Sequence, residues 1–258
     1  MTIFESISIG ACQNFSHRDA TLNNLQKKID DRTYDAIEIN ENNFADFFLK
    51  ARNESWTGFS LTMPLKEIAS ELADQSDDFV KKIKSANTLI KVGEKWIALS
   101  TDAMAFKSLI DLPENSKVKI IGGGGTARAA VGALATSFKQ IEIFLRSTNR
   151  TSDLEAAAGE CELIFKNIDE LDSDGDLIIS TLPSGALDPY AEKLEGGEGI
   201  FFDVLYNPWP TKASSVWLGK IISGHELLVE QAMYQITLMT GVDFNYHLMR
   251  GKLLAAIK

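Results

Sequence analysis

The chain has 258 residues, of which 45% are apolar, and a formal net charge of −10. This composition is ordinary for a globular protein with a sizeable core, and the acidic balance excludes nucleic acid as a main partner, because phosphate binding needs clustered lysine and arginine. Two distant cysteines match no metal spacing, and no apolar run approaches the roughly 18–20 residues of a membrane span. We therefore expect a cytoplasmic protein without a signal peptide, membrane partner or metal.

The first part of the chain alternates short β-rich runs with segments of helical spacing. Strands are predicted at residues 6–10, 34–40 and 58–63, and a helix at residues 20–29. Residues 86–102 differ, because two β-like runs flank Gly93 and predict a hairpin. Strands separated by helices are typical of parallel βαβ units, so we expect a mainly parallel α/β domain here.

The second part begins after Pro113 with a strand, a glycine turn and an alanine-rich helix at residues 117–137. Further strands are predicted at residues 140–146, 176–183, 199–206 and 219–224. A long helix follows at residues 226–240, where apolar positions recur throughout. This order again indicates strands that alternate with helices.

Four successive glycines, residues 122–125, follow the strand VKII and open the helix TARAAVGAL. Glycines allow a tight turn and close backbone approach, and the helix N-terminus offers N–H groups to a pyrophosphate. The spacing departs from G-x-G-x-x-G, because Ala127 stands at its last position. A turn that binds nothing is the alternative, but four glycines are costly in chain entropy without a use.

These elements predict an α/β protein of two domains. We predict a first domain at residues 1–104, on which C-terminal helices at about 226–258 pack back. Residues 105–225 form a Rossmann-type nucleotide-binding domain.

The end of the next strand indicates which nucleotide binds. An NAD site usually has an acidic residue there for the ribose 2′-hydroxyl, whereas this strand ends IFLRSTNR. Arg146 and Arg150, with Ser147 and Thr148 between them, suit a 2′-phosphate, which arginine grips bidentately. A solvated pair of arginines is the alternative. We predict NADP as the cofactor.

Lys66 follows Pro64 by two residues in GFSLTMPLKE. Proline is favoured in the first turn of a helix, so Lys66 is predicted near the positive end of the helix dipole. A cation is disfavoured there, which suits a lysine that exchanges protons near neutral pH. An ordinary surface lysine remains the alternative. Asp102 in LSTDAMAF has two interpretations as well, a functional carboxylate or, like Thr101, a cap of a helix at residues 103–110.

The chain resembles the shikimate dehydrogenase family across nearly its whole length. The resemblance rests on GFSLTMPLKE, SANTL, STD, IIGGGGTAR, LRSTNR, DVLYNPWPT and SGHELLVEQA. TMP and YNPWPT are similar to forms of its actinobacterial branch. The resemblance implies Lys66 and Asp102 as the catalytic pair. It also implies the following substrate-binding and cofactor-binding residues: Ser16, Arg18, Ser60, Thr62, Asn87, Tyr206 and Gln231; and Gly122, Gly123, Gly124, Gly125, Thr126, Ala127, Arg146, Ser147, Arg150, Thr181, Leu182, Pro183, Val204 and Gly224.

The implied activity is a reversible hydride transfer between NADPH and 3-dehydroshikimate, in a monomer or homodimer. Lys66 as an ammonium donates to the developing alkoxide, and Asp102 polarises the lysine and a neighbouring hydroxyl. The cofactor carries the hydride, so the protein has to orient the reactants and exclude water.

The chain departs from the family where the substrate carboxylate is expected. The family's Ser-x-Ser-Pro stretch corresponds to FSHRD, in which Ser16 remains but Arg18 and Asp19 replace the second serine and the proline. Serine also replaces a common asparagine at residues 60 and 100. Arg18 either binds a carboxylate or pairs with Asp19 in solvent. Two alternatives therefore stay open, namely a paralogue acting on quinate or another cyclic hydroxy acid, and a catalytically idle nucleotide-binding sensor.

Overall fold

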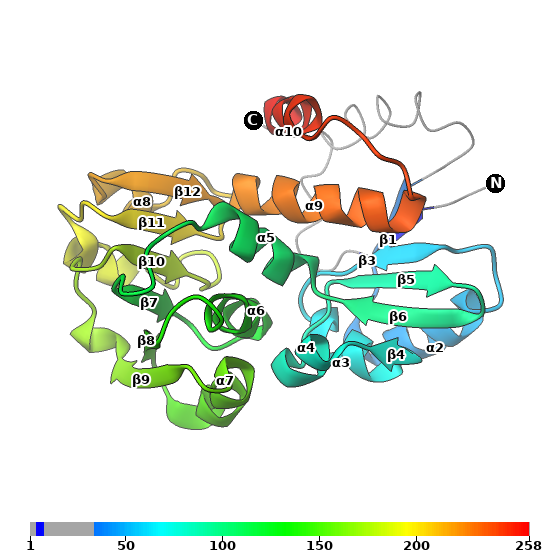
Figure 1. Cartoon of the computed structure of the whole chain (residues 1–258), viewed down its shortest axis with the longest axis horizontal. Helices are drawn as coiled ribbons and strands as arrows, with labels where there is room; N and C mark the ends of the chain where they lie inside the picture. The colour runs from blue at the N-terminus through cyan, green and yellow to red at the C-terminus, as the bar shows by residue number, and fades with distance from the viewer. Residues whose placement is uncertain (1–3, 8–33, 258) are drawn as a thin grey trace. The chain divides into compact units, whose positions relative to one another are not determined.

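The computed structural model describes residues 4–7 and 34–257, which divide into two compact units. Unit 1 comprises residues 1–101 and 229–258, and unit 2 comprises residues 102–228 (Figure 1). The α/β architecture with two units confirms the predicted fold class, and the unit limits at 101 and 229 compare with predicted limits at 104 and 226.

Unit 1 contains a four-stranded sheet of order β3-β5-β6-β4 and a parallel pair, β1-β2. Its strands are β1 (Phe4–Ile7), β2 (Tyr34–Ile37), β3 (Gly58–Ser60), β4 (Gln75–Ser76), β5 (Thr88–Val92) and β6 (Lys95–Leu99). β5 runs antiparallel to both neighbours, whereas β4 runs parallel to β6. The four-stranded sheet is therefore mixed, because the predicted Gly93 hairpin reverses the chain between β5 and β6, while the pair β1-β2 is parallel, so this part of the chain is less parallel than predicted.

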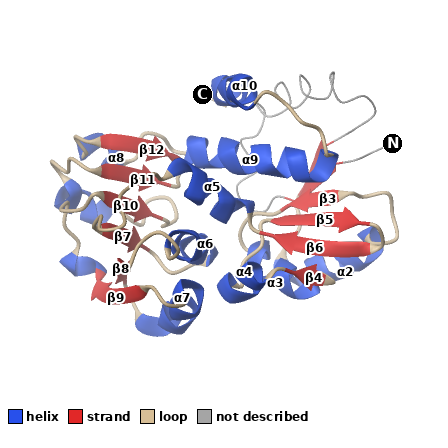
Figure 2. Ribbon diagram, in the orientation of Figure 1, coloured by secondary structure: helices blue, strands red, loops and turns tan. Residues whose placement is uncertain are grey.

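Helices α2 (Glu41–Ala51), α3 (Leu65–Leu72) and α4 (Asp78–Ile83) lie close to the four-stranded sheet of unit 1 (Figure 2). Unit 1 also contains α10 (Tyr246–Ala256) and most of α9 (Gly224–Thr240). The sequence predicts this long helix from residue 226, and α9 begins two residues earlier at Gly224. The helix predicted at residues 20–29 lies outside the described residues, as do residues 8–10 of the first predicted strand.

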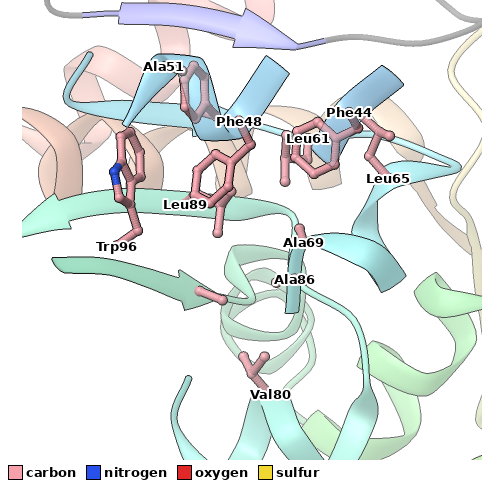
Figure 3. Packing of buried hydrophobic residues seen from close by; sticks show 12 residues of the cluster. Phe44, Phe48, Ala51, Leu61, Leu65, Ala69, Val80, Ala86, Leu89 and Trp96 are labelled. Carbon is pink, nitrogen blue, oxygen red and sulfur yellow. The ribbon is translucent and has the colours of Figure 1, made fainter. Parts of the chain in front are cut away.

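An aromatic and aliphatic cluster forms the core of unit 1 (Figure 3). Phe44 and Phe48 of α2 face Leu89 of β5 and Trp96 of β6. The Trp96 ring stacks on Phe59 with centroids 5.1 Å apart and an interplanar angle of 10°. Offset aromatic contacts of this kind add to the free energy of apolar burial, so the cluster fixes α2 against the sheet that carries the predicted substrate residues.

Unit 2 is built on a six-stranded parallel sheet of order β12-β11-β10-β7-β8-β9. Its strands are β7 (Val118–Ile121), β8 (Gln140–Leu145), β9 (Glu162–Asn167), β10 (Leu177–Ser180), β11 (Ile200–Asp203) and β12 (Lys220–Ser223). Its helices are α5 (Thr101–Leu109), α6 (Gly125–Leu134), α7 (Thr151–Ala158) and α8 (Lys212–Val216). The chain order reverses between β7 and β10, which is the switch point where Rossmann-type sheets bind nucleotides.

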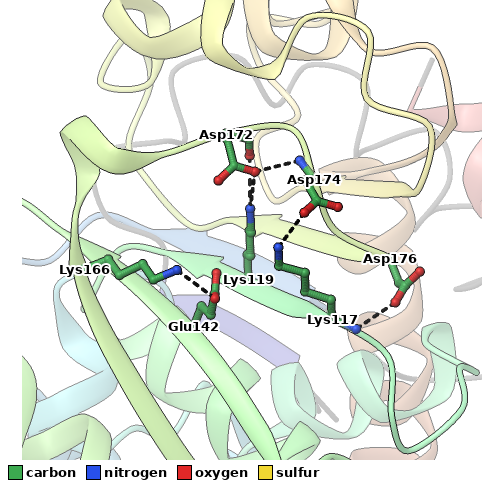
Figure 4. Close-up of polar contacts among 7 residues, drawn as sticks. All are labelled: Lys117, Lys119, Glu142, Lys166, Asp172, Asp174 and Asp176. Carbon is green, nitrogen blue, oxygen red and sulfur yellow. Dashed lines mark hydrogen bonds and ion pairs between the residues drawn. The ribbon is translucent and has the colours of Figure 1, made fainter.

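A charged cluster lies at the amino-terminal side of β7 (Figure 4). The Lys119 side chain is fully buried and donates to Asp172 Oδ1 at 2.5 Å, while Lys117 donates to Asp174 Oδ2 at 2.7 Å. Asp172 also accepts from the backbone N–H of Asp174. Although burial of the carboxyl acts the other way, these hydrogen bonds and Lys119 hold the pKa of Asp172 below its usual value.

None of the helices that the structure describes is long and apolar enough to cross a membrane. Within the same residues, no group of three or more histidine, cysteine, aspartate or glutamate side chains is arranged to hold a metal ion.

Candidate active site

Lys66 occupies the second position of α3, in the first turn as predicted. The helix begins at Leu65 after Pro64, and no side chain caps its N-terminus. Lys66 is half-buried, whereas Leu65 beside it is fully buried in the core. Burial of Leu65 therefore fixes the turn that carries the lysine.

Backbone hydrogen bonds hold the segment from Ser60 to Lys66 against the segment around Asn87. The N–H of Leu61 donates to the Asn87 carbonyl, and the N–H of Ala86 donates to the Lys66 carbonyl, each at 2.8 Å. The antiparallel register of β3 and β5 then sets Ser60 opposite Thr88. Three predicted residues far from Asn87 in the sequence, Ser60, Thr62 and Lys66, are thus gathered beside it.

The Asn87 side chain is 2% exposed and hydrogen-bonds to two other elements. Its Nδ2 donates to Thr101 Oγ1 at 2.8 Å and to Gln231 Oε1 at 3.1 Å. Its Oδ1 accepts from the backbone N–H of Thr101 at 2.7 Å. Asn87 therefore joins the strand β5 to the start of α5 and to α9, which carries the predicted residue Gln231.

Asp102 is the second residue of α5 and is 6% exposed. The helix begins at Thr101, two residues before the predicted start, so Asp102 lies in its first turn, where a carboxylate is favourable. Thr101 is held by the Asn87 side chain at two atoms. The backbone of Asp102 is thus held in place through the residue immediately before it.

In unit 2, the predicted cofactor residues follow the carboxyl ends of five parallel strands. Gly122 follows β7, Arg146 follows β8, Thr181 follows β10, Val204 follows β11 and Gly224 follows β12. Carboxyl ends of parallel strands meet at one edge of a sheet, and nucleotides bind at that edge. The sheet order therefore gathers the predicted set from segments about 100 residues apart.

The glycine turn has the backbone geometry that a close-approaching ligand requires. Gly122 has φ of +116°, and a Cβ there would lie 2.4 Å from Thr181 Oγ1. Gly124 caps α6 with no side-chain hydrogen bond, is exposed, and has no atom within 4 Å of a Cβ position. The first turn of α6 holds Gly125, Thr126 and the buried Ala127. The N-terminus of α6 therefore opens onto space next to the turn.

Arg146 and Arg150 are both exposed, and Ser147 between them is exposed as well. The Cβ of Arg150 lies 3.0 Å from the position that a Cβ on Gly123 would take, so this arginine packs on the glycine turn. A guanidinium anchored beside the turn has the charge to receive a phosphate.

The segments after β10 and β11 complete this edge. Thr181 donates through N and Oγ1 to the Ile121 carbonyl, each at 2.9 Å, while Leu182 is half-buried and Pro183 exposed. A Cβ on Gly224 would lie 2.2 Å from the Val204 carbonyl oxygen. The ring of Tyr206 meets His225 edge-on at 6.0 Å between centroids.

Two predicted substrate residues, Ser16 and Arg18, lie outside the described residues. The remaining predicted residues therefore form two groups, one in unit 1 and one that belongs to unit 2.

Known proteins are similar to the chain over most of its length. The family model of the shikimate dehydrogenase substrate binding domain matches residues 20–89. A shikimate dehydrogenase (NADP(+)) from Leptospira interrogans is 33% identical over 219 residues, which cover 75% of this chain and 74% of that protein. The chain belongs to the shikimate dehydrogenase family. Another such enzyme, from Methanosarcina acetivorans, is 30% identical over 88% of this chain and 89% of its own length.

The family's fold extends over the whole chain. The crystal structure of Mycobacterium tuberculosis shikimate dehydrogenase aligns with a TM-score of 0.83 at 26% identity, covering 99% of this chain and 100% of that one. Membership confirms the resemblance drawn from the motifs, while the placement in an actinobacterial branch stays a prediction.

Several buried polar residues beside the predicted ones were missed by sequence reasoning. Gln235 and Thr88 bond to the Asn87 segment, and a signal existed for Gln235, because it follows Gln231 by one helical turn. Asp203 at the end of β11 accepts from Thr211 Oγ1 at 2.8 Å and from the Leu205 N–H at 3.2 Å. Burial raises the pKa of the Asp203 carboxyl, against the effect of these hydrogen bonds.

Proposed function

We propose that the protein is an NADP-dependent oxidoreductase that interconverts 3-dehydroshikimate and shikimate. The observation that carries this proposal is family membership over most of the chain, with Lys66, Thr62 and Asn87 gathered in unit 1 and a Rossmann-type sheet in unit 2. The matched relatives carry the name shikimate dehydrogenase (NADP(+)). In this assignment, residues 1–104 and about 226–258 bind the substrate, and residues 105–225 bind the cofactor.

The residues of unit 2 fit a dinucleotide with a 2′-phosphate. Gly124 leaves open space at the uncapped N-terminus of α6, where backbone N–H groups receive a pyrophosphate. Arg146 and Arg150 follow β8 and supply cations for the 2′-phosphate, with the Ser147 hydroxyl between them. Thr181, Val204 and Gly224 line the same edge of the sheet. The bound cofactor would supply the hydride.

Lys66 is the proposed general acid and base. Hydride arrival at the substrate carbon leaves negative charge on the carbonyl oxygen, and the Lys66 ammonium stabilises it and donates a proton. In the reverse direction, the neutral amine takes the proton of the hydroxyl.

The other proposed roles concern orientation of the substrate ring. As the family resemblance implies, Asp102 polarises a neighbouring ring hydroxyl and the lysine. Thr62, Asn87, Gln231 and Tyr206 bind the remaining hydroxyl and carbonyl oxygens. Ser60, Ser16 and Arg18 complete the proposed substrate set, and a guanidinium at position 18 would bind a carboxylate more strongly than a serine hydroxyl does.

The test is a spectrophotometric assay of NADPH formation with shikimate, quinate and related cyclic hydroxy acids, each with NADP and with NAD. We expect turnover of shikimate with NADP. Turnover of quinate without turnover of shikimate would refute the proposed substrate. Binding of NADP without turnover of any hydroxy acid would refute the enzymatic assignment and favour a sensor.

Lys66→Ala tests the assignment of the acid–base group in the same assay. We expect kcat to fall by about 10²–10⁴-fold, the range typical of general acid–base groups. Lys81→Ala is the matched control, because Lys81 is an exposed lysine of unit 1 that pairs with Asp78. If Lys66→Ala retained kcat within about threefold of the control, Lys66 would not be the acid–base group.

We also propose a cytoplasmic location, which two cysteines expected to be reduced and a metabolic activity favour. The proposed oligomeric state is a monomer or a homodimer. Sedimentation of the purified chain measures the oligomeric state.

A further inference from the structure

A network of hydrogen-bonded amide and hydroxyl groups runs from the half-buried Ser60 to the buried Gln231 inside unit 1. We infer that Gln235 and Thr88 are positioning residues, which fix the orientation of the Gln231 carboxamide and the start of α5. Both residues hydrogen-bond to protein groups next to the proposed substrate residues, and neither belongs to the predicted site. This inference rests on the proposed function and adds to it the residues that hold the substrate-binding amide in place.

Backbone groups determine which way the Asn87 amide points. The N–H of Thr101 can only donate, so the Asn87 atom 2.7 Å from it must be the oxygen. The nitrogen of Asn87 then faces Thr101 Oγ1 and Gln231, and the Gln231 atom 3.1 Å away must be an acceptor, Oε1. The second polar atom of the Gln231 amide is therefore the donor Nε2. In the proposed function, Nε2 is the atom of this amide that can donate to a substrate oxygen.

A backbone group also determines the orientation of Gln235. The Asn87 carbonyl can only accept, so Gln235 faces it with Nε2, at 3.1 Å. The same nitrogen donates to Thr88 Oγ1 at 2.9 Å. Gln235 Oε1 in turn accepts from the Ser60 hydroxyl at 2.8 Å. Ser60 thus donates its only hydroxyl hydrogen to Gln235, and in the proposed substrate set its oxygen can act only as an acceptor.

Thr88 connects the two amide systems. Its hydroxyl accepts from Gln235 and lies 3.0 Å from Thr101 Oγ1 and 3.4 Å from Asn87 Oδ1. Thr101 Oγ1 lies 3.4 Å from Gln231 Oε1. The hydrogen bonds therefore continue from Gln235 through Thr88 and Thr101 to Gln231.

Burial makes each member of this network depend on the next. Thr88 and Thr101 are fully buried, and Asn87, Gln235 and Gln231 are 2%, 6% and 9% exposed. Water does not replace a lost partner at such positions, so removal of one group leaves its neighbour to reorient. A rotated Asn87 amide would present nitrogen to the Thr101 N–H and release Gln231 Oε1. The change would reach Gln231 and the first turn of α5, where Asp102 lies.

Thr88→Val tests this inference, because valine has the shape of threonine and is favoured in strands. We expect kcat/KM for shikimate to fall about 10-fold or more, while the KM for NADP stays within about twofold. Thr88→Ser keeps the hydroxyl and should stay within about threefold of wild type. Thr237→Val is the matched control, because the Thr237 hydroxyl donates to the Met233 carbonyl of its own helix.

A double-mutant cycle separates positioning from general damage. In a Gln231→Ala background, Thr88→Val should cost less than about threefold, because the amide that it orients is gone. Gln235→Met is the second variant, and it should show the same loss and the same dependence on Gln231. Equal costs with and without Gln231, for whichever of the two variants folds by thermal melting, would overturn the inference.

Failure of the proposed function can be distinguished from failure of this inference. If wild type does not oxidise shikimate, the cycle is measured on the hydroxy acid that it does oxidise, or on shikimate binding by calorimetry. Additive costs in that measurement again overturn the inference, and coupled costs support it.

Discussion

The glycine turn allows backbone strain and cofactor binding to be tested at neighbouring residues. Gly122→Ala places a methyl group where φ is +116°, a region that residues with a Cβ rarely adopt. The same methyl would lie 2.4 Å from Thr181 Oγ1, so Thr181 has to move. Thr181 Oγ1 donates to the Ile121 carbonyl at 2.9 Å, and this hydrogen bond would be lost with the movement.

The cost of Gly122→Ala follows from these two terms. A strained backbone costs about 1–3 kcal/mol, and a lost hydrogen bond costs about 1 kcal/mol. The sum, about 3 kcal/mol, corresponds to a fall in melting temperature of roughly 10 °C for a unit of this size. The measurement is a thermal melt of the full chain followed by circular dichroism.

Gly124→Ala is the matched variant. Gly124 has φ of −78°, and its added Cβ meets no atom within 4 Å, so we expect the unfolding free energy to change by less than about 1 kcal/mol. The methyl group would nevertheless occupy the space in front of the α6 N-terminus. We expect the KM for NADP to rise about 10-fold or more, because the pyrophosphate can no longer approach the backbone.

The reasoning would be refuted by the opposite pattern. A melting temperature of Gly122→Ala within about 2 °C of wild type would show that the turn relaxes without strain. An unchanged KM for NADP in Gly124→Ala would show that the cofactor does not approach this N-terminus.

Two further predictions concern charged residues of unit 2. Arg146→Ala should raise the KM for NADPH about 10-fold or more and leave the KM for NADH within about twofold. The control Lys139→Ala, at the other end of β8, should change neither KM. Equal effects of Arg146→Ala on both cofactors would defeat the 2′-phosphate assignment. Asp172→Ala leaves the buried Lys119 ammonium without its carboxylate and should lower the unfolding free energy by about 2 kcal/mol at pH 7. This value is lower than for a fully buried pair, because Asp172 itself is half exposed. Lys119→Met in the Asp172→Ala background should restore most of the lost unfolding free energy. Since the folded pKa of Asp172 is lowered, its contribution to stability is present above its unfolded pKa of about 3.9 and is lost as the pH falls through the folded pKa. The difference in urea unfolding between wild type and Asp172→Ala should therefore shrink in acid. A difference that stays constant with pH would contradict the ion-pair assignment.

Local patterns predict the elements whose burial is uniform. The strand β7 is buried at every residue and is followed by four glycines, so its run of apolar residues and its end are both visible in the sequence. The hairpin of β5 and β6 is visible because Gly93 adopts φ of +61° in a two-residue turn. Such elements depend on nearest neighbours in the chain, and the prediction succeeds for that reason.

Other elements lack such a clear local pattern or were not predicted despite one. The edge strand β9 has an apolar run of only three residues, Leu163 to Phe165, which are half-buried and lie between the charged residues Glu162 and Lys166. α2 is different, because Phe44, Phe47, Phe48 and Ala51 follow helical spacing after the cap Asn40, and the signal for a helix was present although the helix was not predicted.

Prediction of the site has a different limit. The type of a residue does not tell whether its side chain contacts a ligand or holds another side chain in place. Asn87 and Gln231 are 144 residues apart, and Asn87 and Gln235 are 148 apart, so no local pattern reports that their amides meet. Only the register of β3 on β5 and the packing of α9 in unit 1 bring them together. A glutamine read from a motif can therefore be assigned to the site, but the direction in which its amide points follows from a backbone N–H and a backbone carbonyl. In this chain the Thr101 N–H orients Asn87, and Asn87 in turn fixes Gln231 Oε1 toward itself, while the Asn87 carbonyl orients Gln235.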